Sequence, residues 1–168
     1  MTTPPRAQLP PPVDLVLEYR AALLARLEQQ PTDFVTAIAA IPAPGWHQQR
    51  SPDGRTVHLA AAHVRDLEVL AYLPHVRRIL AEDHPTLTAE AHHTWSAANY
   101  DPAEPMTAIL AAWSQARTEL LAWLRPLPPA GWGRIGFHPP SGNRTSQWWV
   151  ERAYGHVRGH LAAVQQAG

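Results

Sequence analysis

The chain has 168 residues, with 14 basic and 14 acidic side chains and no formal net charge at pH 7. This length suits one domain with a sizeable core, and the balanced charge argues against nucleic acid or an anionic membrane as a partner. There is no Cys, which excludes disulfides, a thiol nucleophile and Cys-type zinc sites, so soft-metal chemistry must use His. All basic side chains are Arg, which argues against a Schiff-base lysine.

Residues 1–12 are rich in proline and predict a flexible tail before a single domain over 13–168. The tail lacks the apolar segment of a signal peptide. No later segment approaches the ~18 uninterrupted apolar residues of a membrane span. We therefore expect a cytoplasmic protein with no membrane contact.

The first predicted helix runs from Val13 to about Gln30, because its apolar residues recur at intervals of three and four. Pro31 should interrupt it, since proline removes a backbone donor and clashes with the preceding turn. A short helix should follow over 32–41, with Thr32 as its N-cap.

Three further helices are predicted, over about 56–81, 103–125 and 145–166. Pro74 should kink or split the first of these. The connections are read as loops, with a short helix in the stretch before residue 100 and a long Pro/Gly-rich loop over 126–143. No segment alternates with period two. The predicted fold is therefore all-α, a four-helix bundle with long inter-helix connections.

His156 and His160 lie four residues apart at the edge of the apolar face of the last predicted helix. Side chains with this spacing stack along a helix and can offer two nitrogens to one cation. His63 and Asp66 lie within the apolar stripe of the second predicted helix, where a carboxylate is costly unless it is paired or coordinated. One interpretation is that His63, His156 and His160 bind one divalent metal with open positions, as in a catalytic site. The alternative is a chance spacing in a His-rich chain.

His58 points about 140° away from His63 on the same helix, so both cannot face one centre. His138, in the Pro/Gly-rich loop, is a candidate to border the site. The other histidines are expected at the surface or in loops: His47, His75, His84, His92 and His93. Arg117 lies beside an apolar stripe and should either pair with Asp66 or Glu68 or bind an anionic group of a substrate.

Four features follow one another along the chain: Trp46 after the first helix, "HVRDLE" (63–68) on the second, Arg117 on the third, and "HPPSG" (138–142) before His156 and His160. In this order, they resemble the pattern of the DinB/YfiT-like superfamily of metal-binding four-helix bundles. The departures are Pro74 in the second helix, and Gly155 and Gly159 beside the His pair, where helix propensity is lost.

The resemblance covers nearly the whole chain after the tail. It implies that His63, His156 and His160 bind zinc or nickel, with iron as a third candidate. It also implies a homodimer, and chemistry that uses a low-molecular-weight thiol such as bacillithiol or mycothiol.

Three hypotheses of function follow, each with a small-molecule substrate or ligand. The first is a thiol S-transferase in which the metal lowers the pKa of the incoming thiol, Asp66 orients a ligand or accepts a proton, and Arg117 meets a carboxylate of the thiol. The second is a metal-dependent hydrolase of an amide or ester, with Asp66 as base. The third is a stress-induced metal- or ligand-binding protein without turnover.

Overall fold

The computed structural model describes residues 14–88 and 92–167, so the predicted boundary between tail and domain at residue 12 lies outside the described residues. The long helices are α1 (Leu15–Ala39), α2 (Val57–Leu67), α3 (Leu73–Ala81), α5 (Met106–Leu124) and α6 (Ser146–Ala167). The short helical elements are η1 (Ala43–His47), η2 (Glu68–Tyr72), α4 (His92–Ala98) and η3 (Pro129–Gly133). Strands β1 (Ile135–His138) and β2 (Gly142–Thr145) form an antiparallel hairpin.

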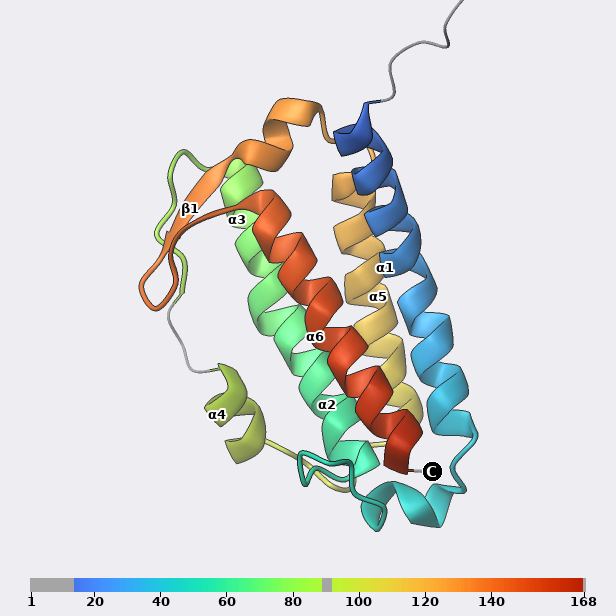
Figure 1. The fold of residues 1–168 in the computed structure, drawn as a ribbon. Coiled ribbons are helices and arrows are strands. Elements are labelled where there is room, and N and C mark those ends of the chain that lie inside the picture. Colours follow the sequence, from blue (N-terminus) through green and yellow to red (C-terminus); the bar gives the residue numbers. More distant parts are fainter. Residues whose placement is uncertain (1–13, 89–91, 168) are drawn as a thin grey trace, which may run out of the picture.

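The helices α2 and α3 join through η2 into one long helix, so the predicted four-helix bundle is confirmed (Figure 1). Helix α1 packs on α5 and α6, and α2–α3 packs on the same two helices. The first two helices therefore occupy opposite corners of the bundle. In Figure 1, α2–α3 and α5 run in the same direction, and the connection that carries α4 returns the chain to the start of α5.

The interior consists of two apolar clusters stacked along the bundle. The cluster nearer the hairpin includes Leu27, Leu120 and Trp149, and the other includes Phe34, Trp113 and Val157. In α1, α5 and α6, a few residues separate the positions that belong to one cluster from those that belong to the other. Polar side chains lie between the two clusters at this height of the bundle.

We call Gln30, Glu68 and Arg117 the polar layer. All three are buried; Glu68 is 0% and Arg117 1% exposed. Arg117 donates to Glu68 Oε2 and to Gln30 Oε1, both at 2.9 Å. Gln30 Nε2 in turn donates to the carbonyl oxygen of Tyr154 at 2.9 Å. The layer therefore links α1, the π-helical turn η2, α5 and α6 through buried hydrogen bonds.

Helix α1 continues through Pro31, so the predicted break and the N-cap at Thr32 are wrong. Asp14 caps the helix instead, since its side chain accepts from the backbone N–H groups of Val16 and Leu17. A proline inside a helix costs about 3 kcal/mol. The apolar side chains buried on both sides of it, including Leu27 and Phe34, offset that cost.

The turn η2 is a single π-helical turn that ends two residues before Pro74. It interrupts the regular α-helix just before the proline, where the sequence predicts a kink or a split. A π-helical turn holds about one extra residue, so it rotates the face of every residue that follows. His75 is consequently 1% exposed, and its predicted surface position is wrong. His84 is exposed, as expected.

The segment predicted as a Pro/Gly-rich loop contains η3 and most of the hairpin, which was not expected. Its strands have only four residues each, too few for an alternating pattern to show. Gly142 adopts a φ of +73° at the start of β2, a conformation that favours glycine. In the described ranges, no helix is long and apolar enough to cross a membrane.

Candidate metal centre

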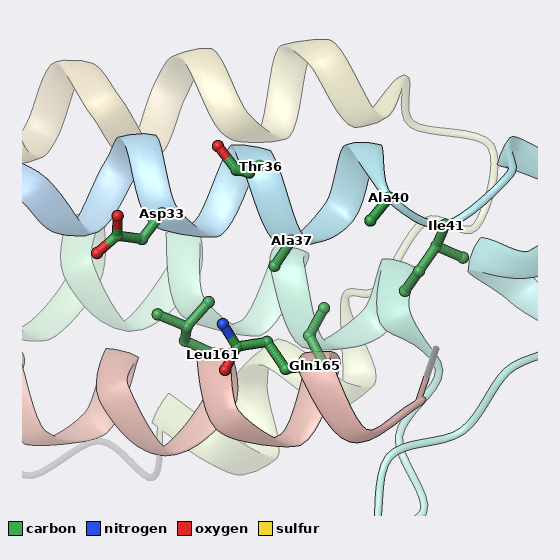
Figure 2. Close-up of a pocket in the computed structure, with 8 residues that line it drawn as sticks. Asp33, Thr36, Ala37, Ala40, Ile41, Leu161 and Gln165 are labelled. Carbon is green, nitrogen blue, oxygen red and sulfur yellow. The ribbon is translucent and has the colours of Figure 1, made fainter.

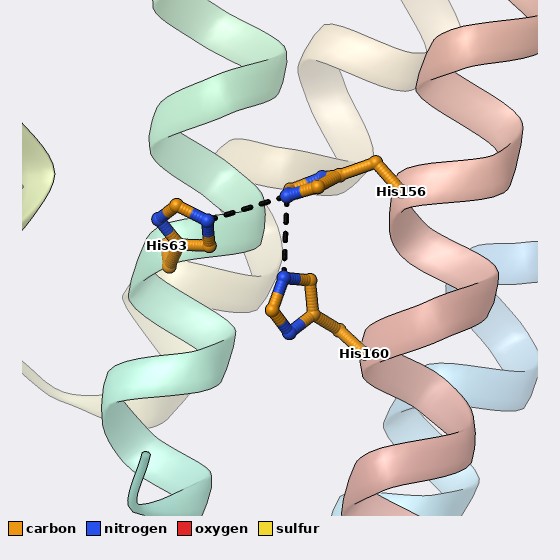
Figure 3. Close-up of side chains that lie close together, drawn as sticks. All are labelled: His63, His156 and His160. Atoms are coloured by element: carbon orange, nitrogen blue, oxygen red, sulfur yellow. Dashed lines mark hydrogen bonds between the residues drawn. The ribbon is translucent and has the colours of Figure 1, made fainter. Parts of the chain in front are cut away.

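Three imidazoles meet where α2 faces α6: His63 from α2, and His156 and His160 from α6 (Figure 3). The Nε2 atom of His156 lies 3.3 Å from Nε2 of His63 and 3.2 Å from Nε2 of His160. One nitrogen from each residue lies within 4.8 Å of the other two. The structure therefore brings together all three residues expected to bind a metal.

The local sequence explains this convergence. His63 belongs to a run of small and apolar residues on α2 that packs into the core, and it is 3% exposed. His156 and His160 are half-buried at the edge of the face that α6 presents to α2. Their spacing of four residues stacks the two rings on one side of the helix, with centroids 4.6 Å apart.

The spacing of the nitrogens fits a single metal ion. Metal–nitrogen distances of about 2.0–2.1 Å in a tetrahedral site place ligand nitrogens about 3.3–3.4 Å apart. The two Nε2 distances at His156 are 3.3 and 3.2 Å. A ring nitrogen has one proton or one lone pair, so Nε2 of His156 cannot form a good hydrogen bond with both neighbours. A cation satisfies all three nitrogens at once.

In the part of the chain that the structure describes, no carboxylate joins this group of three nitrogens. Three protein ligands leave a coordination position for a small molecule, which is the pattern of catalytic rather than structural zinc sites. Imidazoles bind zinc, nickel and iron(II) alike, so the ligand set is compatible with each of the expected metals.

A carboxylate approaches the centre from the loop between η1 and α2. Asp53 Oδ2 lies 4.0 Å from Nδ1 of His160, within ion-pair distance and beyond hydrogen-bond length. Partial burial raises the pKa of Asp53, but hydrogen bonds from Ser51 and Arg55 outweigh it and lower the pKa to about 2. The carboxylate is thus ionised at neutral pH, held by Ser51 and Arg55, and it presents a negative charge to the imidazole of His160. Sequence reasoning missed Asp53 because a loop has no periodicity.

The centre opens into a hollow of about 460 Å³ that His156, His160 and Asp53 help to line. Gly155 and Gly159 lie in the same wall, and a Cβ atom added to either would meet no heavy atom within 4 Å. Each glycine weakens the helix by about 0.5–1 kcal/mol relative to alanine, and no neighbour requires its small size. What the glycines provide is open space beside two of the three imidazoles.

Another hollow, of about 590 Å³, lies between α1 and α6 close to where both helices end (Figure 2). Its walls include Ala37, Ile41 and Leu161, and none of the three imidazoles lines it. Although it is the larger hollow, it offers no ligand cluster, so size does not locate the chemistry.

Tyr72, from η2, was not predicted as part of the centre. Its ring lies 5.6 Å from that of His156 and 6.5 Å from that of Trp149, between centroids. Burial raises the pKa of Tyr72 to about 12, so the phenol stays neutral. Tyr72 therefore forms an uncharged wall behind His156. The π-helical turn moved it to this face, and an ideal helical wheel does not contain such a turn.

Asp66 lies one helical turn after His63, as expected, and it is 6% exposed. Its Oδ1 accepts from Arg65 Nε and its Oδ2 from Ser96 Oγ, both at 2.6 Å. Both oxygens are thus engaged, and Ser96 lies on α4. This arrangement favours a role in holding α2 and α4 together over proton acceptance, and the catalytic role of Asp66 stays a prediction.

Arg117 forms the buried ion pair with Glu68 described above, one of the two pairings that its sequence position indicated. Its guanidinium also lies 5.8 Å from the centroid of the Trp113 ring. These contacts account for the burial of Arg117 without a substrate. Its expected contact with a substrate carboxylate stays a prediction.

His138 does not join the cluster of three imidazoles. It lies in β1, where its Nδ1 is 2.9 Å from Ser141 Oγ and its ring packs 5.1 Å from that of Trp149. His58 faces away from the centre, with Nδ1 2.8 Å from the Tyr100 hydroxyl. The side chains of His92 and His93 lie outside the described part of the chain.

The fold and the site together define a class of protein: a four-helix bundle with a cluster of three His that is suited to a metal ion. The chain belongs to the DinB superfamily, whose family model matches residues 26–164. This match confirms the family that the sequence resembled.

Among solved structures, the chain is similar to YfiT from Bacillus subtilis, described as a probable metal-dependent hydrolase with an unusual four-helix bundle topology. The TM-score is 0.81 and the identity 19%, over 98% of this chain and 91% of that chain. At this identity the likeness shows the fold. No curated protein matches the sequence.

Proposed function

We propose that the protein is a metal-dependent hydrolase of small amides or esters, with His63, His156 and His160 as ligands of one divalent metal. The observation that carries this proposal is the convergence of three imidazole nitrogens, with two of the three residues, His156 and His160, lining an accessible hollow. Its volume of about 460 Å³ lies within the range of about 300–1,000 Å³ typical of small-molecule sites. The description of YfiT as a probable metal-dependent hydrolase supports the same class of reaction.

A divalent metal in such a site supplies Lewis acidity and lowers the pKa of a water molecule that it binds. The protein's own contribution is placement. His63 anchors the ligand set in the core, while His156 and His160 present it to the hollow. The Tyr72 ring packs behind His156, and the Asp53 carboxylate lies 4.0 Å from Nδ1 of His160, where its negative charge favours a cation at the centre.

The proposal is tested by removing and restoring the metal. We expect zinc- or nickel-loaded protein to hydrolyse p-nitrophenyl acetate with saturation kinetics. Treatment with a chelator should abolish the activity, and the metal should restore it without any added thiol. Unchanged hydrolysis after complete removal of the metal would contradict the proposal.

Replacing Gly159 by alanine should have opposite effects on the stability of the protein and on substrate access to the centre. We expect the variant to be more stable in urea by about 0.5–1 kcal/mol, because alanine favours the helix and nothing crowds the new methyl group. Its kcat/KM should fall severalfold, because the methyl group narrows the hollow beside His160. The control is Gly133→Ala, where a methyl group also enters open space but lies outside this hollow. Unchanged kcat/KM in Gly159→Ala would show that substrate does not use this wall.

The second candidate is the thiol S-transferase that the resemblance implies. It is favoured by the size of the hollow, which has room for a cosubstrate beside the ligands, and by the lack of Cys, because the reactive sulfur would come from that cosubstrate. Activity that needs bacillithiol or mycothiol together with the metal would favour this function. Metal binding without either activity would leave the non-catalytic role.

A further inference from the structure

Three side chains of α6 form a row that leads to the candidate metal centre. Trp148, Arg152 and His156 follow one another at intervals of four residues, which places them on one side of the helix. All three line a hollow of about 290 Å³, together with Glu151 and Gly155. This hollow shares Gly155 and His156 with the larger one beside the centre. A molecule bound at the metal can therefore extend along the row.

Arg152 brings a positive charge into this hollow, and no carboxylate of the described residues lies within ion-pair distance of it. Its guanidinium carbon lies 5.9 Å from the ring centroid of Trp148, and that of Arg144 lies 5.1 Å from the same ring. Two cations therefore share one aromatic side chain. Of the two, Arg152 lies in the same hollow as His156, one of the three imidazoles of the candidate metal centre.

Glu151 also lines this hollow, and one of its two carboxylate oxygens is held by neighbouring side chains. Its Oε1 accepts from the Tyr19 hydroxyl at 3.0 Å and from Gln147 Nε2 at 2.9 Å. These bonds tie it to the start of α1. Arg144 donates from Nη1 to the backbone oxygen of Asn143 at 2.9 Å, and it forms no ion pair with a carboxylate in the part of the chain that the structure describes. The row thus carries excess positive charge, and a guanidinium binds a carboxylate through two parallel hydrogen bonds.

We propose that Arg152, supported on Trp148, binds a carboxylate of the substrate beside the metal centre, so that the protein acts on amides or esters that carry a negative charge near the bond to be cleaved. The reaction in this inference rests on the proposed function. The anion contact is argued independently of it, from the positions of Trp148, Arg152 and His156. It gives Arg152 the role that sequence reasoning assigned to Arg117. The negative charge of Asp53, at the His160 end of the centre, makes the two ends of the site electrostatically different.

The test is equilibrium binding of benzoate, with benzamide as the neutral probe, to zinc-loaded and metal-free protein by titration calorimetry. In both forms, Arg152→Gln should weaken benzoate binding about tenfold or more and leave benzamide binding unchanged. Arg152→Lys should fall between the two, because an ammonium lacks the planar fork. The matched control is Arg158→Gln, which removes the same charge from an exposed position about 160° around the helix from His156. It should bind benzoate as the wild type does.

Equal affinity of the wild type and Arg152→Gln for benzoate would overturn the inference, and so would an equal loss in Arg158→Gln. A loss seen only with zinc bound would also count against it, because Arg152 would then act through the metal. Hydrolysis is measured separately, with p-nitrophenyl acetate and its hemisuccinate analogue. If the protein hydrolyses neither ester but Arg152→Gln weakens benzoate binding, the proposed hydrolase function is refuted and the anion site is supported.

Discussion

Replacing His63 by alanine should reduce the bound divalent metal from about one ion per chain to less than about a tenth of that value. His63 is the only imidazole of the cluster that α2 supplies, and the remaining pair on α6 offers two nitrogens, fewer than the three or four protein ligands of zinc sites. Loss of hydrolysis should accompany loss of the metal. Elemental analysis after dialysis against a metal buffer measures the first effect, and turnover of p-nitrophenyl acetate measures the second.

The same variant should lose the dependence of stability on metal. An ion that binds only the folded state stabilises it by about 4 kcal/mol when its concentration is about 1,000 times the Kd. Thermal unfolding of the wild type should therefore shift to lower temperature on chelation. His63→Ala should unfold at the same temperature with and without chelator.

His84→Asn is the control, because it removes an exposed imidazole outside the cluster. His84 has a φ of +45°, and asparagine tolerates this left-handed conformation better than most residues. The control should keep its metal and its shift on chelation. A His63→Ala variant that retains a full equivalent of metal would show that the ion binds elsewhere.

The helices and the clustering of the three imidazoles could be predicted because both depend on a period of 3.6 residues. His156 and His160 share a side of α6 by their spacing, and His63 stands out as a polar residue in a buried stripe. No such regularity marks Asp53, because a loop places its carboxylate through tertiary contacts. The same holds for the hairpin, whose strands are too short to show alternation.

The misplaced residues have local causes. Pro31 was expected to end a helix, but the burial of apolar residues on both sides outweighs its cost. The π-helical turn before Pro74 shifts the helical face, which brings Tyr72 to His156 and carries His75 into the interior. The position of this π-helical turn next to the candidate metal centre agrees with the frequent occurrence of such turns at functional sites.

We expect a second large effect, on the free energy of unfolding, from a substitution in the polar layer. Breaking the buried ion pair of Glu68 and Arg117 leaves one charge without its partner. Glu68→Leu should lower the free energy of unfolding by about 3–5 kcal/mol, as measured by urea denaturation. The exposed pair of Glu28 and Arg125 is the matched control, and Glu28→Leu should have little effect because water screens that pair.

The double variant Glu68→Leu with Arg117→Met separates a structural role of Arg117 from a catalytic one. Apolar residues of similar volume often replace a buried ion pair without loss of stability. We expect most of the stability to return, short of the full value because Gln30 loses a donor. If Arg117 serves only the core, the double variant should bind metal and hydrolyse p-nitrophenyl acetate like the wild type. A variant that is stable and metal-loaded but inactive would instead assign Arg117 to the reaction, since the fold and the ligands would both be intact.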